Sequence, residues 1–137
     1  MATTSLAQLY EKPILANWDN LAFSDFDGGD FTYGQVAEYI KSLHLFYQVS
    51  GIKKGDKIAI LGRNSARWGT AFLSVLTSGA VVVPVLPDFN VTDTNHILNH
   101  SEARIVFAQK SLLDKIDLTK APGVETVVML DNYTINY

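Results

Sequence analysis

The hydrophobic positions of the chain follow two periods that alternate from about residue 33 onward. One period is helical: after Thr32, apolar or aromatic residues recur at positions 33, 36, 37, 40, 43 and 47, on one face of a helix. The other consists of short apolar runs at residues 58–61, 80–83 and 105–107, which predict strands at 57–61, 80–83 and 104–107 that are buried on both faces. Strict alternation of strand and helix predicts an α/β fold, with a mainly parallel sheet, right-handed crossovers and helices on both faces.

Turn and capping residues mark the ends of these elements. Thr32 and Gln35 match a capping box, and Gly51 is expected to end the same helix in a left-handed conformation. Asn64 or Ser65 is expected to cap the next helix, and Gly79 to end it. The expected helices span residues 5–11, 33–50, 66–77, 92–100 (capped by Thr92) and 111–116, and the expected strands residues 21–24, 31–32, 57–61, 80–83, 104–107 and 125–130.

The segment at residues 25–30 separates the first two expected strands and so predicts a small N-terminal hairpin. It is rich in Asp and Gly, which favour tight turns. The spacing of Asp25, Asp27 and Asp30 is similar to that of a calcium loop. However, the glycine comes too early and Val36 stands where a bidentate glutamate belongs. A turn is therefore the preferred interpretation.

Composition restricts the class of protein. The 137 residues fit one domain, here residues 1–137, and a net charge of −3 with scattered Lys and Arg gives no indication of a nucleic-acid partner. There is no cysteine and no secretion signal in the first twelve residues, so we expect a cytoplasmic protein. Residues 68–87 are uncharged and long enough to span a bilayer, but Gly79 and Pro84 divide them into a helix and a strand, so no transmembrane segment is expected.

The turn Gly62-Arg63-Asn64-Ser65 is the best local candidate for an anion site. It follows a predicted strand and opens a predicted helix, where open α/β sheets bind ligands and helix N-termini attract phosphate. It has a single glycine and matches neither of the glycine-rich phosphate motifs. Helix capping by Asn64 or Ser65 is therefore the preferred interpretation.

The histidines give no clear indication of catalysis. His96 and His100 are four apart, as in the zinc-protease motif, but Ile97 replaces the required glutamate and no third ligand is evident. We expect ordinary surface histidines there and no metal site. His44 lies beside the apolar face of its helix and is expected to contact a carbonyl group rather than to catalyse.

The hydroxyl and aromatic side chains also have structural rather than functional interpretations. No base is expected near the hydroxyl residues of the second long helix, which are Thr70, Ser74, Thr77 and Ser78. The aromatic residues of the first long helix are expected to pack in the core and not to stack on bases; they are Tyr33, Tyr39, Phe46 and Tyr47.

Several short sequence motifs, taken in their order along residues 20–130, resemble the opening region of the adenylate-forming enzymes. They are Phe31-Thr32-Tyr33, GDKIAI at 55–60, Asn64-Ser65 with Trp68, GAVVVP at 79–84 followed by Pro87, ILNHSEA at 97–103 and IVF at 105–107. Within this superfamily the chain is similar to the acyl-CoA synthetases, and Trp68 with ILNHSEA looks most like their long-chain fatty-acid branch.

The resemblance implies a two-step reaction in the complete protein. A carboxylate attacks the α-phosphate of ATP to give an acyl-adenylate, and CoA then displaces AMP; ATP, Mg²⁺ and CoA are therefore the implied cofactors of the full-length enzyme. The family's Ser/Thr/Gly-rich phosphate loop and its C-terminal catalytic lysine have no counterpart in these residues. The resemblance thus implies an N-terminal part, truncated before the phosphate loop and inactive alone, with no catalytic, cofactor-binding or metal residue.

Two other interpretations stay open. The chain could be a small nucleotide- or anion-binding α/β module, with its site near Gly62–Ser65. It could also be an interaction module whose apolar surface docks a partner. A truncated domain would leave the same kind of surface uncovered, so its expected partners are the remainder of its own chain or a second copy.

Overall fold

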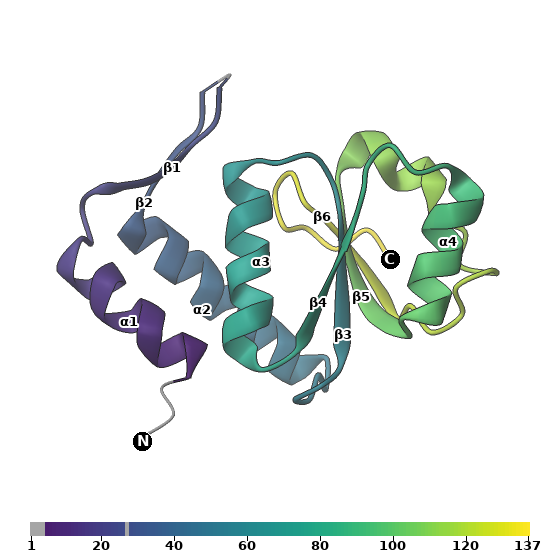
Figure 1. Ribbon diagram of the computed structural model, residues 1–137, viewed down its shortest axis with the longest axis horizontal. Coiled ribbons are helices and arrows are strands. Elements are labelled where there is room, and N and C mark those ends of the chain that lie inside the picture. The colour runs from purple at the N-terminus through teal and green to yellow at the C-terminus, as the bar shows by residue number, and fades with distance from the viewer. Residues whose placement is uncertain (1–4, 27) are drawn as a thin grey trace.

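The computed structural model describes residues 5–26 and 28–137 (Figure 1). The N-terminal part consists of α1 (Leu6–Ala16), the antiparallel hairpin of β1 (Leu21–Ser24) and β2 (Asp30–Thr32), and α2 (Tyr33–Val49). The rest alternates strands and helices: β3 (Lys57–Leu61), α3 (Ala66–Ser78), β4 (Val81–Val85), α4 (Val91–His100), β5 (Ala103–Ala108), the 3₁₀-helix η1 (Lys110–Lys115) and β6 (Thr126–Met129).

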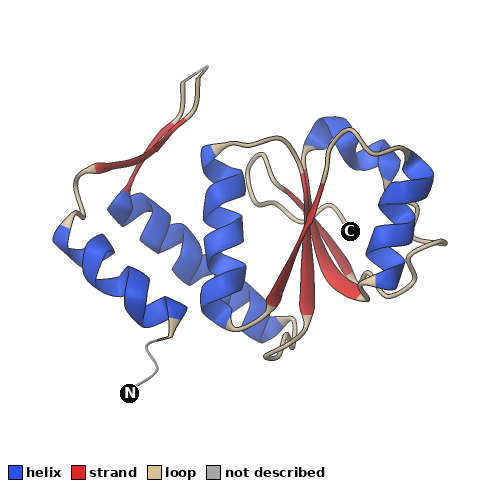
Figure 2. Cartoon of the chain, viewed as in Figure 1, coloured by secondary structure: helices blue, strands red, loops and turns tan. Residues whose placement is uncertain are grey.

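The larger sheet is parallel, and its strand order is β4-β3-β5-β6. β3 pairs with β4 on one side and with β5 on the other, and β6 continues the sheet beyond β5. Figure 2 shows helices on both sides of the sheet. Side chains from α2 and α3 pack on one face, and those from α4 and η1 on the other. The predicted fold class, including the small hairpin, is confirmed.

The continuous apolar runs are explained by burial on both faces. In β3, Ile58 and Ile60 pack against α2 and α3, whereas Ala59 and Leu61 face α4. All four side chains are fully buried. Burying an isoleucine or leucine in this way contributes about 1.5–3 kcal/mol, so these runs hold the two helical layers onto the sheet.

The predicted ends of α2 are confirmed. The Gln35 N–H donates to Thr32 Oγ1 at 3.2 Å, and the Thr32 N–H donates to Gln35 Oε1 at 2.9 Å, which completes the capping box. At the other end Gly51 has a φ of +67°, and the Ile52 N–H donates to the Tyr47 carbonyl at 2.9 Å. This is the Schellman arrangement, and it lets Ile52 pack back onto the core as expected.

Two prolines lie inside elements that the sequence analysis ended too early. α1 was expected to stop at residue 11 but continues through Pro13 to Ala16. None of its residues is buried, so water can satisfy the carbonyl that Pro13 leaves without a donor. β4 was expected at residues 80–83 but continues through Pro84 to Val85. Because β4 is an outer strand of the sheet, the missing N–H need not remove a ladder hydrogen bond.

The start of α4 also corrects the sequence analysis. Asn90, not Thr92, is the N-cap, and its Oδ1 accepts a hydrogen bond from the Asp93 N–H at 2.8 Å. Asparagine caps at least as well as threonine, and the helix begins at Val91, which places Thr92 in its first turn. The other boundaries lie at the expected residues or one residue away, as the bounds given above show.

The uncharged stretch at residues 68–87 divides as predicted. It contains most of α3, the left-handed Gly79 with a φ of +85°, and β4. Among the residues that the structure describes, no helix has both the length and the apolar character needed to cross a bilayer.

Candidate functional site

The carboxyl ends of the strands meet a turn of the hairpin at one edge of the sheet. Asp25 follows β1, Ser65 follows β3, Gln109 follows β5 and Asp131 follows β6. These residues, with Arg67 and Leu130, line a hollow of about 220 Å³. Ligands of open α/β sheets bind at this edge, so the hollow is the place to look for the predicted anion site.

Three backbone donors in and next to the predicted anion site are bonded to the chain's own side chains. The Ala66 N–H, at the start of α3, donates to Asp25 Oδ1 at 2.6 Å. The Trp68 N–H donates to Ser65 Oγ at 3.1 Å, and the Arg63 N–H donates to Gln109 Oε1 at 3.2 Å. The capping interpretation is confirmed, with Ser65 and not Asn64 as the N-cap. Asp25 already supplies the negative charge that this helix start favours.

The two arginines near the hollow, Arg63 and Arg67, contact other groups of the chain. Arg63, at the exposed tip of the turn, pairs with Asp88 at 3.1 Å. The Arg67 guanidinium lies over three aromatic rings, with Cζ 5.3 Å from the centroid of Phe31 and 5.2 Å from those of Tyr39 and Tyr133. These cation–π contacts tie β2, α2, α3 and the C-terminal turn together, so Arg67 acts as a packing element.

Asp25 belongs to a turn, as predicted. The Asp25 N–H donates to the Gly29 carbonyl and the Gly28 N–H to the Asp25 carbonyl, both at 3.1 Å. Its carboxylate faces α3, whereas Asp30 contacts the Ser24 hydroxyl. The two carboxylates therefore have separate partners, and Asp27 lies outside the described residues.

His44 contacts a carbonyl group, as predicted. Its Nε2–H donates to the Ser74 carbonyl oxygen at 2.9 Å and lies 3.1 Å from Thr77 Oγ1. Both contacts cross from α2 to α3, and sequence reasoning missed the one to Thr77. Because the carbonyl can only accept, Nε2 carries the proton and cannot take one from Thr77. The Thr77 hydroxyl instead donates to the Leu73 carbonyl at 2.7 Å.

The other hydroxyls of α3 are also engaged. Thr70, Ser74 and Ser78 each donate to a backbone carbonyl three or four residues earlier, at 2.7–2.8 Å. The Tyr47 hydroxyl donates to Ser74 Oγ at 2.7 Å. Burial raises the pKa of Tyr47, so it stays a neutral packing residue. Tyr47 also packs edge-on against Phe107 at 6.3 Å, in agreement with the predicted core role.

His96 and His100 lie on the exposed side of α4, with ring centroids 5.8 Å apart. Within the described part of the chain, no group of three or more His, Cys, Asp or Glu side chains is placed to hold a metal ion.

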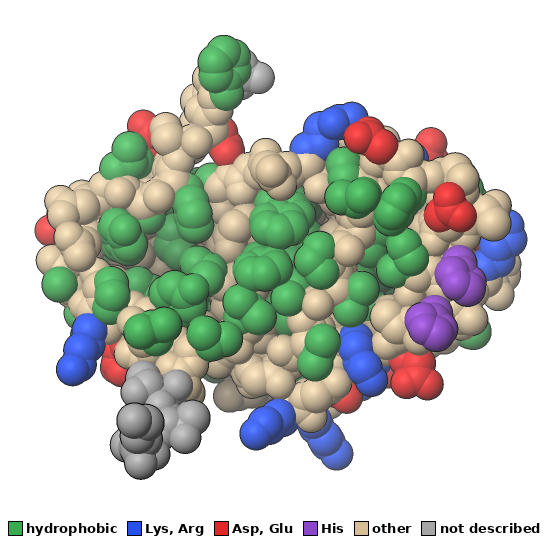
Figure 3. Space-filling view, viewed as in Figure 1, with side chains coloured by type: hydrophobic (Ala, Val, Ile, Leu, Met, Phe, Trp, Pro, Cys, Tyr) green, Lys and Arg blue, Asp and Glu red, His purple; other side chains and the backbone are tan. Residues whose placement is uncertain are grey.

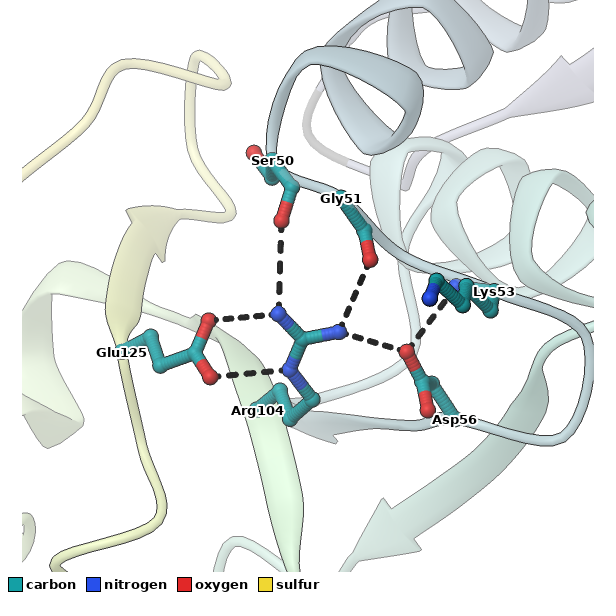
Figure 4. A network of polar contacts seen from close by, with 6 residues as sticks. All are labelled: Ser50, Gly51, Lys53, Asp56, Arg104 and Glu125. Atoms are coloured by element: carbon teal, nitrogen blue, oxygen red, sulfur yellow. Dashed lines mark hydrogen bonds and ion pairs between the residues drawn. The ribbon is translucent and has the colours of Figure 1, made fainter.

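Arg104 forms a polar network at the opposite edge of the sheet, where the strands begin (Figure 4). Its guanidinium donates to both oxygens of Glu125, at 2.9 and 2.8 Å, and also to Asp56. It also donates to the carbonyls of Gly51 at 3.0 Å and Ser50 at 3.4 Å. The network therefore joins the end of α2 to the starts of β3, β5 and β6.

The network lowers the pKa of both carboxyl groups. For Asp56 the main cause is the hydrogen bond from the Lys53 backbone N–H, followed by Arg104. For Glu125 the main cause is the hydrogen bond from Arg104. Sequence reasoning missed this site because Asp56 and Glu125 lie 48 and 21 residues away from Arg104. Its position at the amino ends of the strands, away from the hollow, indicates a structural role.

The region around α1 carries an uncovered apolar surface. α1 has no buried residue, and a cleft of about 610 Å³ is lined by residues of α1, α2 and α3. In Figure 3 hydrophobic side chains gather in a band from α1 across α3 toward the outer strand β4. We call the exposed residues of this region the α1 apolar surface; they are Leu6, Leu9, Leu15, Trp18 and Leu21. Exposed apolar side chains gathered in this way make the surface a candidate contact surface.

Comparison with protein families gives a match over nearly the whole chain. Residues 11–136 match the family described as AMP-binding enzyme. The matched residues include the hairpin, the whole parallel sheet and the hollow at its carboxyl edge.

Two curated relatives illustrate the range of proteins to which the chain is similar. It is 30% identical over 104 residues to the medium-chain fatty-acid–CoA ligase of Escherichia coli strain K12, covering 76% of this chain and 18% of that protein. It is 29% identical over 105 residues to surfactin synthase subunit 2 of Bacillus subtilis strain 168, covering 77% of this chain and 3% of that protein. The chain thus spans less than a fifth of the length of either relative.

A solved structure shares the fold. The anthranilate CoA ligase AuaEII, whose crystal structure holds anthranoyl-AMP, superposes with a TM-score of 0.85. The match covers 93% of this chain and 25% of that one at 21% identity. The chain therefore has the fold of one part of an adenylate-forming enzyme.

Proposed function

The chain belongs to the AMP-binding enzyme family, and from this membership we propose that it is the N-terminal part of a fatty-acid–CoA ligase. The complete protein would join a fatty acid to CoA in two steps. The carboxylate displaces pyrophosphate from ATP to give an acyl-adenylate, and the CoA thiol then displaces AMP to give the thioester. Support for the ligase activity comes from the family match and from the similarity to a fatty-acid–CoA ligase.

Within that protein we propose a structural and not a catalytic role for residues 1–137. One observation carries this proposal: two backbone donors at the start of α3, the N–H groups of Ala66 and Trp68, are bonded to Asp25 and Ser65. A phosphate group would have to displace the Asp25 carboxylate, which carries the same sign of charge. We propose that the groups that bind ATP and Mg²⁺ lie in other parts of the protein, since the Asp25 carboxylate stands where a phosphate group would approach the start of α3.

The choice of a fatty acid as substrate rests on the resemblance to the fatty-acid branch and on the E. coli relative. Surfactin synthase subunit 2 is similar to nearly the same degree, so the substrate needs a direct test. We also propose a cytoplasmic location, which the cysteine-free composition supports.

Pyrophosphate exchange into ATP tests both parts of the proposal. The 137-residue chain should support no exchange with any carboxylate, whereas a longer protein that contains it should support exchange with medium- or long-chain fatty acids. The matched substrates are benzoate and a set of amino acids. Robust exchange by the short chain would refute the structural role. Exchange by the longer protein with benzoate or amino acids alone would refute the fatty-acid assignment and leave the family membership intact.

The α1 apolar surface suggests what the chain contacts. We propose that the remainder of the same protein covers it in the complete enzyme, and that the isolated chain associates with a second copy through it. The absence of any buried residue in α1 supports this proposal. The same surface also supports the alternative of a protein-interaction module, which would bind a separate partner there.

A further inference from the structure

His96 and His100 lie one turn apart on α4 with nearly parallel rings. The ring centroids are 5.8 Å apart and the ring planes differ by 11°. Two histidine side chains are seen next to one another on the surface in Figure 3. Both residues are exposed, and across residues 5–26 and 28–137 no hydrogen bond or ion pair holds either imidazole. We propose that this pair is a bidentate site for a divalent transition-metal ion, of the class of Cu²⁺, Ni²⁺ or Zn²⁺.

The helix that carries the pair is firmly held. Thr94, Asn95 and Leu98, on the opposite side of α4, are buried against the rest of the molecule. The Asn95 side chain donates to the Lys115 carbonyl at 2.9 Å and accepts from the Asp117 N–H at 2.8 Å. The backbone positions of both histidines are therefore fixed before a metal arrives. Only side-chain rotation is needed to turn two ring nitrogens toward one ion, because residues four apart are neighbours on a helix surface.

The ligand chemistry selects the class of ion. Neutral imidazole nitrogen suits copper, nickel and zinc, whereas Mg²⁺ and Ca²⁺ prefer oxygen ligands. Two nitrogen ligands leave the other coordination positions to water, so the site is open. The proposal departs from the sequence analysis, which expected no metal site at these histidines. The site still differs from that of a zinc protease, since Ile97 supplies no general base. The bound ion would join successive turns of α4 and would add to the stability of the folded chain.

Metal titration of the 137-residue chain tests the proposal independently of the proposed enzymatic function. Metal-free protein is titrated with NiCl₂ and CuCl₂ by calorimetry, and thermal unfolding is followed with and without each ion. The variants are His96→Ala and His100→Ala, with Asn99→Ala as an exposed control on the same helix. Circular dichroism confirms that each variant folds.

We expect the wild type and Asn99→Ala to bind one ion per chain, with Cu²⁺ bound more tightly than Ni²⁺. Each histidine variant should bind at least about tenfold more weakly, because one ligand of the chelate is gone. Its metal-dependent rise in unfolding temperature should disappear. Equal affinity in the wild type and both histidine variants would overturn the proposal. An equal rise in unfolding temperature with Mg²⁺ would overturn it as well.

Discussion

The carboxylate of Asp25 accepts a hydrogen bond from the backbone N–H of Ala66 at 2.6 Å, which joins the hairpin to the first turn of α3. A helix start carries unpaired N–H groups and a partial positive charge, and a carboxylate satisfies both. The contact places a carboxylate beside the turn at Gly62–Ser65, where an anion would otherwise approach the helix start. It also fixes the hairpin against the edge of the sheet.

Removing this carboxylate should therefore destabilise the fold. We expect Asp25→Ala to lower the free energy of unfolding by about 0.5–2 kcal/mol, the range measured for lost helix caps. Asp25→Asn keeps an acceptor at the same place and should lose less. Urea denaturation of the three proteins measures both values. If alanine and asparagine cost the same, the hydrogen bond contributes nothing and the account of the occupied site is wrong.

The contacts that the sequence revealed are local ones. The capping box needs only Thr32 and Gln35, which are three residues apart. The Asp25–Ala66 bond joins residues 41 apart, and no local pattern distinguishes Asp25 from the other acids of its turn. The parallel direction of the strands and the sheet edge at their carboxyl ends were readable in outline, because alternation of strand and helix dictates parallel pairing. Which side chain fills a helix start depends on how the hairpin folds back, and this only the three-dimensional structure shows.

Arg104, whose side chain is 27% exposed, should be more sensitive to replacement than the exposed cations of the chain. Replacement by methionine removes the hydrogen bonds to Glu125, Asp56 and two carbonyls and should cost about 1–2 kcal/mol, since partial exposure screens the charges. Arg104→Lys should recover only part of this, because lysine lacks the planar fork that binds both Glu125 oxygens. Urea denaturation measures each cost.

Arg63→Met is the matched control for this prediction. Arg63 pairs with Asp88 alone, and their side chains are 68% and 80% exposed. Its replacement should change stability by at most about 0.5 kcal/mol. Equal effects at Arg63 and Arg104 would mean that the network adds nothing beyond an exposed ion pair.

The same network should make stability depend on pH in the acid range. The folded chain lowers the pKa of Asp56 below its ordinary value of 3.8 and that of Glu125 below 4.5. The unfolded chain therefore takes up protons first as the pH falls. The contribution of the network is complete above about pH 5 and is lost as the pH falls through the lowered values.

A pH series of urea denaturations checks this dependence. The stability difference between wild type and Arg104→Met should be constant from about pH 5 to pH 7 and should shrink below pH 4. A difference that stays constant down to pH 2 would show that the carboxylates do not take part.

Gly34 allows the Trp18 ring to lie directly against α2. A β-carbon at residue 34 would lie 2.6 Å from both Cε2 and Nε1 of Trp18, which is closer than atoms can approach. We expect Gly34→Ala to displace the ring and to lower stability by about 1–3 kcal/mol, as overpacking does. Tryptophan fluorescence should shift to longer wavelength as the indole becomes more exposed. Gly28→Ala, in open space but at a φ of +89°, is the control: it should lower stability through backbone strain without moving the fluorescence.

The α1 apolar surface should drive self-association of the isolated chain. Leu9 and Leu15 are 57% and 63% exposed, so glutamate at both positions adds charge to the surface without opening the core. Sedimentation velocity at rising concentration should show association for the wild type and a monomer for the Leu9→Glu, Leu15→Glu variant. The control, Thr92→Glu with Asn99→Glu, adds the same charge to exposed positions of α4 and should associate like the wild type. A wild type that stays monomeric at high concentration would count against both proposed roles of the surface. An apolar surface that does not bind a second copy would not be expected to bind the remainder of the chain or a separate partner either.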